Sequence, residues 1–64
     1  MSAHDETLTY RQAVGARIRE LRVESNLTQW QLGELVGADH KTIHRIEYGR
    51  SDPPLSLLVR IARA

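Results

Sequence analysis

Apolar residues recur at a helical spacing along most of this chain. They stand three or four positions apart, and no stretch has the alternation of apolar and polar residues that is typical of a strand. One such stripe is Tyr10, Val14, Ile18 and Leu21, and another is Leu55, Leu58, Ile61 and Ala62. The pattern predicts an all-α fold, with helices over about residues 9–25, 28–37, 40–48 and 54–63 around one core.

Residue types that cap helices stand near the ends of these segments. Thr9 with Gln12, and Thr28 with Gln31, have the spacing of capping boxes. Asp39 is expected to cap the third helix, because its carboxylate can accept from the first free backbone N–H groups. The predicted helix stops are Asn26, Gly37 and Gly49.

The length of the chain limits what it can be. Its 64 residues suffice for one domain with a small core and leave no room for a second, catalytic domain. Residues 1–8 are polar and aperiodic, so we expect them to be disordered and residues 9–64 to form the domain. His40 and His44 have the spacing of a metal-binding pair but lack further ligands, and no nucleophile motif is present. We expect no enzyme, no metal and no cofactor.

The composition points to the cytoplasm. The chain contains no cysteine, so neither a disulfide framework nor a zinc-thiolate site is available to it. No apolar run approaches the length of a membrane span, and the first residues lack a signal pattern. We therefore expect a cytoplasmic protein with no membrane contact.

Residues 29–48 carry the pattern of two short helices joined by a tight turn. The positions that form it are Leu32, Gly33, Val36, Gly37, Ile43 and Ile46. The apolar pair of each helix buries one face, the first glycine would allow the helices to cross closely, and the second would allow the turn. The outward face of the second helix then presents His40, Lys41, His44 and Arg45.

Those four side chains are hydrogen-bond donors suited to phosphates and base edges. The total charge gives this interpretation little support, because nine Lys and Arg stand against eight Asp and Glu, for a net charge of +1. The prediction of nucleic-acid binding therefore depends on where the cations lie on the helix face and not on the total charge.

The chain resembles the Cro/repressor (XRE) helix-turn-helix family over residues 14–64. The residues that carry the resemblance include Gly15, Leu27-Thr28-Gln29, Gly37, Ile46-Glu47, Gly49, Pro53 and Ile61-Ala62. The resemblance implies a compact lambda-repressor-like domain, of which this chain holds four helices where the family normally has five. We expect either a fragment of a longer protein or a partner chain that covers the exposed end of the core.

The resemblance also implies roles for individual residues. Base contacts are expected from His40, Lys41, His44 and Arg45, and phosphate contacts from Gln29, Thr42 and Arg50. Arg22 and Glu47 resemble a structural ion pair between the first and third helices. Trp30 could pack on the first helix, contact DNA sugars or contact a partner protein. Partial packing in the core is the commonest environment of a lone Trp in a small domain.

The function implied is that of a sequence-specific transcriptional regulator, by default a repressor, which binds double-stranded DNA as a homodimer through the helix 40–48. Two alternatives stay open. An antitoxin or controller protein would bind DNA and also a partner protein, and a pure interaction module would bind no DNA. Salt-dependent binding to duplex DNA would favour the regulator, whereas an exposed apolar patch beyond Ile61 would favour a partner protein.

Overall fold

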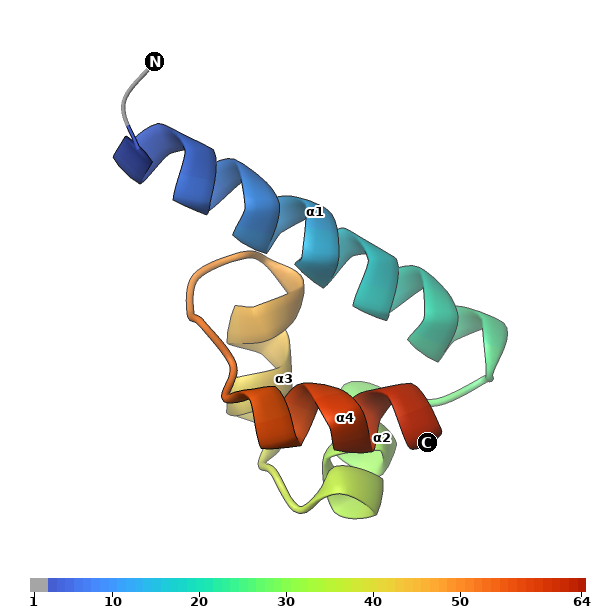
Figure 1. Cartoon of the computed structure of the whole chain (residues 1–64). Coiled ribbons are helices and arrows are strands. Elements are labelled where there is room, and N and C mark those ends of the chain that lie inside the picture. Colours follow the sequence, from blue (N-terminus) through green and yellow to red (C-terminus); the bar gives the residue numbers. More distant parts are fainter. Residues whose placement is uncertain (1–2) are drawn as a thin grey trace.

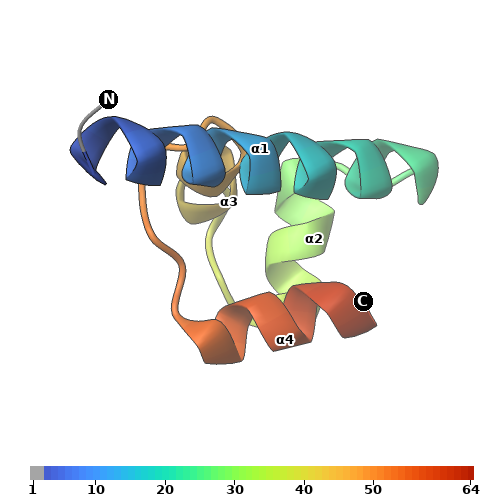
Figure 2. The ribbon, with the colours of Figure 1, turned by 45° about the horizontal axis from the view of Figure 1, so that its top comes forward.

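The protein, seen in a computed structural model that describes residues 3–64, folds into four α-helices. They are α1 (Ala3–Glu24), α2 (Gln29–Val36), α3 (His40–Glu47) and α4 (Leu55–Arg63). The long helix α1 forms one side, α4 lies on the opposite side, and α2 and α3 lie between them (Figures 1 and 2). No strand occurs in the described residues, and the predicted all-α fold is confirmed.

The start of α1 corrects one prediction. We expected residues 1–8 to be disordered and Thr9 to cap the helix, but α1 already begins at Ala3, so Thr9 lies in its interior. Residues 1–2 lie outside the described part of the chain. Since no residue here breaks a helix, α1 extends through the segment that lacks an apolar period.

The capping signals around α2 act as predicted. The Thr28 hydroxyl accepts from the backbone N–H of Gln31 at 3.0 Å, and the Gln31 side chain accepts from the backbone N–H of Thr28 at 2.8 Å. Asn26 adopts a φ of 59° after α1, and Gly37 a φ of 77° after α2. These short-range interactions are encoded by neighbouring residues, which makes them readable from the sequence.

The ends of α3 and α4 agree closely with the predicted ones. Asp39 caps α3, as expected, by accepting from the backbone N–H of Thr42 at 2.8 Å. The helix ends at Glu47, one residue earlier than predicted, and Gly49 follows with a φ of 71°. After the next loop, Pro54 precedes α4.

Residues from all four helices form the core, which consists of Ile18, Leu32, Val36, Ile43, Ile46 and Leu57. The predicted apolar faces of α2 and α3 are confirmed. On α1, Ile18 is buried whereas Tyr10, Val14 and Leu21 of the same stripe are exposed. On α4, Leu58 and Ile61 pack against the core as predicted. The buried residue of that helix is Leu57, however, and Leu55, which we also placed on the core face, is 76% exposed.

Two glycines allow close packing, at places that differ from the prediction. A Cβ on Gly33 would collide with the backbone carbonyl oxygen of Ala38, so Gly33 packs against the turn and not against a crossing helix. The close helix crossing lies at Gly15 on α1. A Cβ there would collide with the carbonyl oxygen of Ile46 and come within 2.7 Å of the carbonyl oxygen of Glu47, in the last turn of α3.

Candidate nucleic-acid interface

A concave surface lies between the start of α2 and the outer face of α3. It encloses about 470 Å³, and we call it the basic hollow; its lining residues are Gln29, His40, Lys41, His44, Arg45 and Arg50. Six of the seven residues predicted to contact DNA therefore come together on one surface. Lys41, Arg45 and Arg50 supply cations, and none of the described residues that line the hollow is acidic.

Thr42 is the predicted contact that lies outside the basic hollow. Its side chain is half-buried in the first turn of α3, where its backbone N–H donates to the carboxylate of Asp39. The structure thus ties Thr42 to the helix cap. Of the other residues on α3 that we expect to contact DNA, Lys41, His44 and Arg45 are exposed and His40 is half-buried.

Three acids of the segment 39–52 have partners in the protein, which accounts in part for a positive surface on a chain of net charge +1. The Asp39 carboxylate caps α3, and an oxygen of Asp52 lies 3.5 Å from Nε of Arg11. The Glu47 side chain is fully buried against Arg22. Within the described part of the chain, Lys41 forms no ion pair. The same holds for Arg45 and Arg50 in that part, so their charges are free for an anionic partner.

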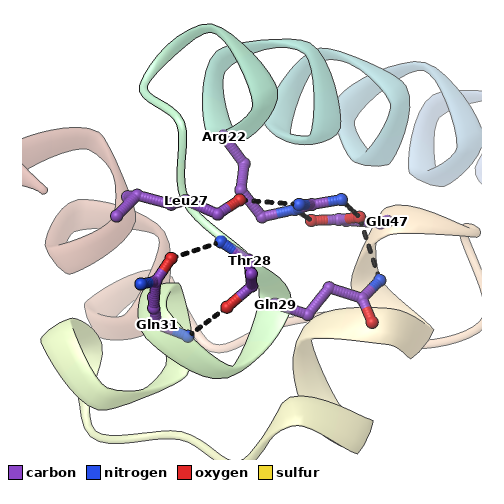
Figure 3. Close-up of polar contacts among 6 residues, drawn as sticks. All are labelled: Arg22, Leu27, Thr28, Gln29, Gln31 and Glu47. Carbon is purple, nitrogen blue, oxygen red and sulfur yellow. Dashed lines mark hydrogen bonds and ion pairs between the residues drawn. The ribbon is translucent and has the colours of Figure 1, made fainter.

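The expected contact between Arg22 and Glu47 joins α1 to α3 (Figure 3). Nε of Arg22 lies 2.6 Å from Oε2 of Glu47, and Nη2 lies 3.1 Å from Oε1, so the contact is bidentate. Nη1 of Arg22 donates to the carbonyl oxygen of Leu27 at 2.8 Å. The guanidinium therefore also holds the segment that leads into α2.

Gln29 adds a third donor to this carboxylate, which sequence reasoning missed. Its Nε2 donates to Oε1 of Glu47 at 3.1 Å, and Figure 3 shows the amide reaching across from the start of α2. The two residues are eighteen positions apart, and no local pattern links them. Because Gln29 also lines the basic hollow, the buried ion pair fixes one wall of that surface.

Trp30 corrects another expectation. Its side chain is 62% exposed and does not join the core, although partial core packing is the commonest place for a lone Trp. The indole instead stacks on the imidazole of His40, with ring centroids 3.7 Å apart and planes inclined by 17°. A second ring contact, between His44 and Tyr48, is looser, at 4.6 Å and 38°.

The cap at Asp39 makes the stability of the protein dependent on pH. The hydrogen bond from the backbone N–H of Thr42 lowers the pKa of Asp39 below its ordinary value of 3.8, the Thr42 hydroxyl lowers it further, and the charges of His40 and Lys41 add to this. A lowered pKa means that the folded state prefers the charged carboxylate. The stabilisation is complete above the ordinary pKa and is lost as the pH falls through the folded one.

We therefore predict that acid weakens the parent protein more than the Asp39→Asn variant, whose amide oxygen can still cap α3 but does not titrate. Thermal unfolding followed by circular dichroism between pH 2 and 6 measures the effect. The difference in Tm between parent and variant should be constant above the ordinary pKa and should shift against the parent below it. A difference that stays constant down to pH 2 would show that the cap carboxylate titrates alike in both states.

Other kinds of site find no support in the part of the chain described. Among residues 9–64, whose side chains the structure describes, no group of three or more His, Cys, Asp and Glu is arranged to hold a metal ion. None of the helices that the structure describes combines the length and apolar character needed to cross a membrane.

Comparisons with known proteins agree with this geometry. A family model of the helix-turn-helix domain matches residues 13–64. A protein of Methanothermobacter thermautotrophicus, named as an uncharacterized HTH-type transcriptional regulator, is 53% identical over 47 residues, which cover 73% of this chain and 68% of the relative. Two proteins of Archaeoglobus fulgidus with the same name are each 43% identical over 47 residues, covering 73% of this chain and 66% and 67% of their own lengths. The chain therefore belongs to the helix-turn-helix family of DNA-binding transcriptional regulators.

Proposed function

We propose that this protein is a repressor that binds a specific duplex sequence by placing α3 in the major groove. The basic hollow carries the proposal, because it gathers six predicted contact residues on one concave, cationic surface. The major groove of B-DNA is wide enough for an α-helix, and the phosphates on either side attract cations. A protein bound there would block a promoter by occupying it. We place it in the cytoplasm, with the DNA that it controls.

The seven residues predicted to contact DNA, six in the hollow and Thr42 outside it, divide into two proposed roles. His40, Lys41, His44 and Arg45 lie on α3 and read base edges, and Arg45 has the fork of donors that pairs with guanine. The phosphate contacts come from the periphery, at Gln29, Thr42 and Arg50. Gln29 opens α2, where the positive end of the helix dipole also favours a phosphate, and Arg50 lies just beyond the end of α3. Phosphate contacts position the domain on DNA without reading sequence.

Arg45→Ala tests the reading role. The variant should bind the preferred duplex more weakly by about 1–3 kcal/mol, or roughly 5- to 150-fold, while its affinity for random duplex changes little. The preferred duplex is first obtained by selection from random sequences with the parent protein. Titrations at one fixed salt concentration then compare both duplexes, since salt alone changes the affinity.

Arg50→Ala is the matched control, because it removes the same side chain from the edge of the same hollow. It should weaken both duplexes by a similar factor, as expected for a phosphate contact. If Arg45→Ala also weakens both duplexes equally, Arg45 does not read a base. If the parent itself shows no preference among duplexes, the proposed sequence-specific function is wrong.

A second surface supports a proposal about assembly. An apolar groove of about 480 Å³ lies between α1 and α4, lined mainly by Val14, Ile18, Leu21, Leu58 and Ile61. Exposed apolar area of this kind is typical of protein interfaces. We place a second copy of the chain there, which gives a two-fold dimer whose α3 helices enter successive major grooves about 34 Å apart. The same groove also favours the alternative of an antitoxin or controller protein that binds a different partner.

Sedimentation over a wide concentration range tests the dimer. The parent should associate, and Leu21→Glu should weaken that association by at least about tenfold, because a charge would be buried in an apolar contact. Leu35→Glu is the control, since Leu35 is exposed on α2 and does not line the groove. A parent that remains monomeric and binds half of a palindromic site as well as the whole would contradict the dimer.

A further inference from the structure

The stack between Trp30 and His40 joins the two helices of the helix-turn-helix at its outer surface. Trp30 is the second residue of α2, and His40 is the first residue of α3. The ring centroids lie 3.7 Å apart, and the planes are within 17° of parallel, which is van der Waals contact over the ring faces. Because Trp30 stays 62% exposed, the contact adds little to the core. Its main effect is on the position of the His40 ring.

The polar atoms of His40 show how the stack orients the ring. Nδ1 is buried and has no hydrogen-bond partner in the described structure. No hydrogen bond from Nδ1 fixes the ring, so the stack on Trp30 is the contact that orients it. Nε2 on the opposite edge is then the atom left to bond with a partner outside the protein. His40 also lines the basic hollow, where such a partner would lie.

The backbone that carries Trp30 is fixed at the start of α2. The preceding residue, Gln29, is tied to the buried carboxylate of Glu47, and Thr28 closes the capping box at the start of α2. The indole therefore projects from a fixed helix end. An imidazole packed on it loses little further rotamer freedom when it binds, and a side chain ordered in advance binds more tightly for that reason.

We propose that Trp30 is a positioning residue for base reading: it stacks on His40 and aims Nε2 into the basic hollow, so that sequence preference depends on an indole that itself touches no base. The proposal rests on the proposed function, in which His40 contacts a base edge. It assigns to Trp30 an effect on specificity and not a contact with the DNA backbone.

The test compares four proteins with the parent: Trp30→Phe, Trp30→Leu, His40→Ala, and the double variant with Trp30→Leu and His40→Ala. Each is titrated with the preferred duplex, with its single base-pair variants and with random duplex. Phenylalanine keeps a ring for stacking, whereas leucine keeps apolar bulk without one. Circular dichroism melting confirms that each protein is folded under the conditions of the titration.

The expected result is a loss of preference at one base pair. His40→Ala and Trp30→Leu should each reduce discrimination at the same base pair by about three- to tenfold, the range for one hydrogen bond. Trp30→Phe should keep most of the preference. The double variant should resemble His40→Ala alone, because two residues that act through one contact are not additive.

A measurement on the free protein checks the stack itself. The ring protons of His40 lie over the indole face, so their NMR signals should be shifted upfield in the parent. The shift should disappear in Trp30→Leu and persist partly in Trp30→Phe. Tyr48→Leu is the control at the other ring pair, and it should change neither those signals nor the preference at the base pair affected by His40→Ala.

Several outcomes would overturn the inference, and they are distinguishable from failure of the proposed function. If His40→Ala relaxes the preference and Trp30→Leu does not, Trp30 does not position His40. If Trp30→Leu weakens all duplexes equally, Trp30 contacts the DNA backbone. If His40→Ala leaves every preference unchanged, the inference fails while sequence-specific binding through other residues stands. If the parent has no preference at all, both the inference and the proposed function fail.

Discussion

Arg22→Ala is expected to lower the free energy of unfolding by about 3–5 kcal/mol, the usual cost of leaving a buried charge without its partner. The Glu47 side chain is 0% exposed and the Arg22 side chain only 12%. The carboxylate would lose two of its three donors and keep the amide of Gln29. The carbonyl oxygen of Leu27 would lose its donor as well.

The size of the domain makes this change severe. A chain of this length has a stability of roughly 3–10 kcal/mol, by the usual range for each residue. Arg22→Ala should therefore be largely unfolded or melt at a much lower temperature, as measured by circular dichroism or urea titration. Arg22→Lys keeps the charge but lacks the bidentate fork, so it should lie between the parent and the alanine variant.

Arg17→Ala provides the matched control on the same helix. Arg17 pairs with Glu20 at 2.9 Å, but the two side chains are 63% and 61% exposed. An exposed pair of this type contributes about 0–1 kcal/mol. If Arg22→Ala and Arg17→Ala lowered the free energy of unfolding by similar small amounts, the buried Arg22–Glu47 contact would contribute no more to stability than an exposed ion pair does.

The parts of the fold that could be predicted depend on short-range interactions. The capping box at Thr28, the cap at Asp39 and the left-handed residues at Asn26 and Gly37 involve neighbours within a few positions. Such interactions take the same form in most folds, and the helix ends that they define are correct to about one residue. The apolar spacing on α2 likewise identified the residues that face the core.

The errors arose where distant contacts decide the outcome. Tyr10, Val14, Ile18 and Leu21 have the right spacing for a core stripe on α1, but only Ile18 among them is buried. On α4, Leu58 and Ile61 pack against the core as predicted, but the buried residue is Leu57 and not Leu55. Hydrophobic spacing identifies a helix, and the angle at which helices pack decides which part of its face is covered.

The candidate site shows the same division. The outward face of α3 follows from its spacing, so His40, Lys41, His44 and Arg45 could be selected from the sequence, and Gln29 and Arg50 from the family resemblance. The stack of Trp30 on His40 and the hydrogen bond from Gln29 to Glu47 could not be predicted, because each joins residues ten or more positions apart. Such pairs become neighbours only when α2 and α3 are packed.

Gly15→Ala is expected to destabilise the protein although alanine is the better helix former. Alanine is favoured over glycine by about 1 kcal/mol within a helix. Against this, the added Cβ would meet the backbone carbonyl oxygens of Ile46 and Glu47, which belong to the last turn of α3 and cannot rotate away. Overpacking typically costs about 1–3 kcal/mol. We expect a value near the upper end of that range, because the added Cβ would meet backbone atoms and not a flexible side chain.

Ala16→Gly, at the adjacent exposed position of α1, calibrates the helix effect. Its free energy of unfolding should fall by about 1 kcal/mol, which is the difference in helix propensity between alanine and glycine. No packing effect is expected, because Ala16 is exposed. Urea unfolding of the parent and of both variants measures the two changes in the free energy of unfolding under the same conditions. Gly15→Ala should be the less stable variant, and α3 should shift relative to α1, which weakens DNA binding by moving the basic hollow. If Gly15→Ala were as stable as the parent or more so, α1 and α3 would not cross as closely as the position of Gly15 requires.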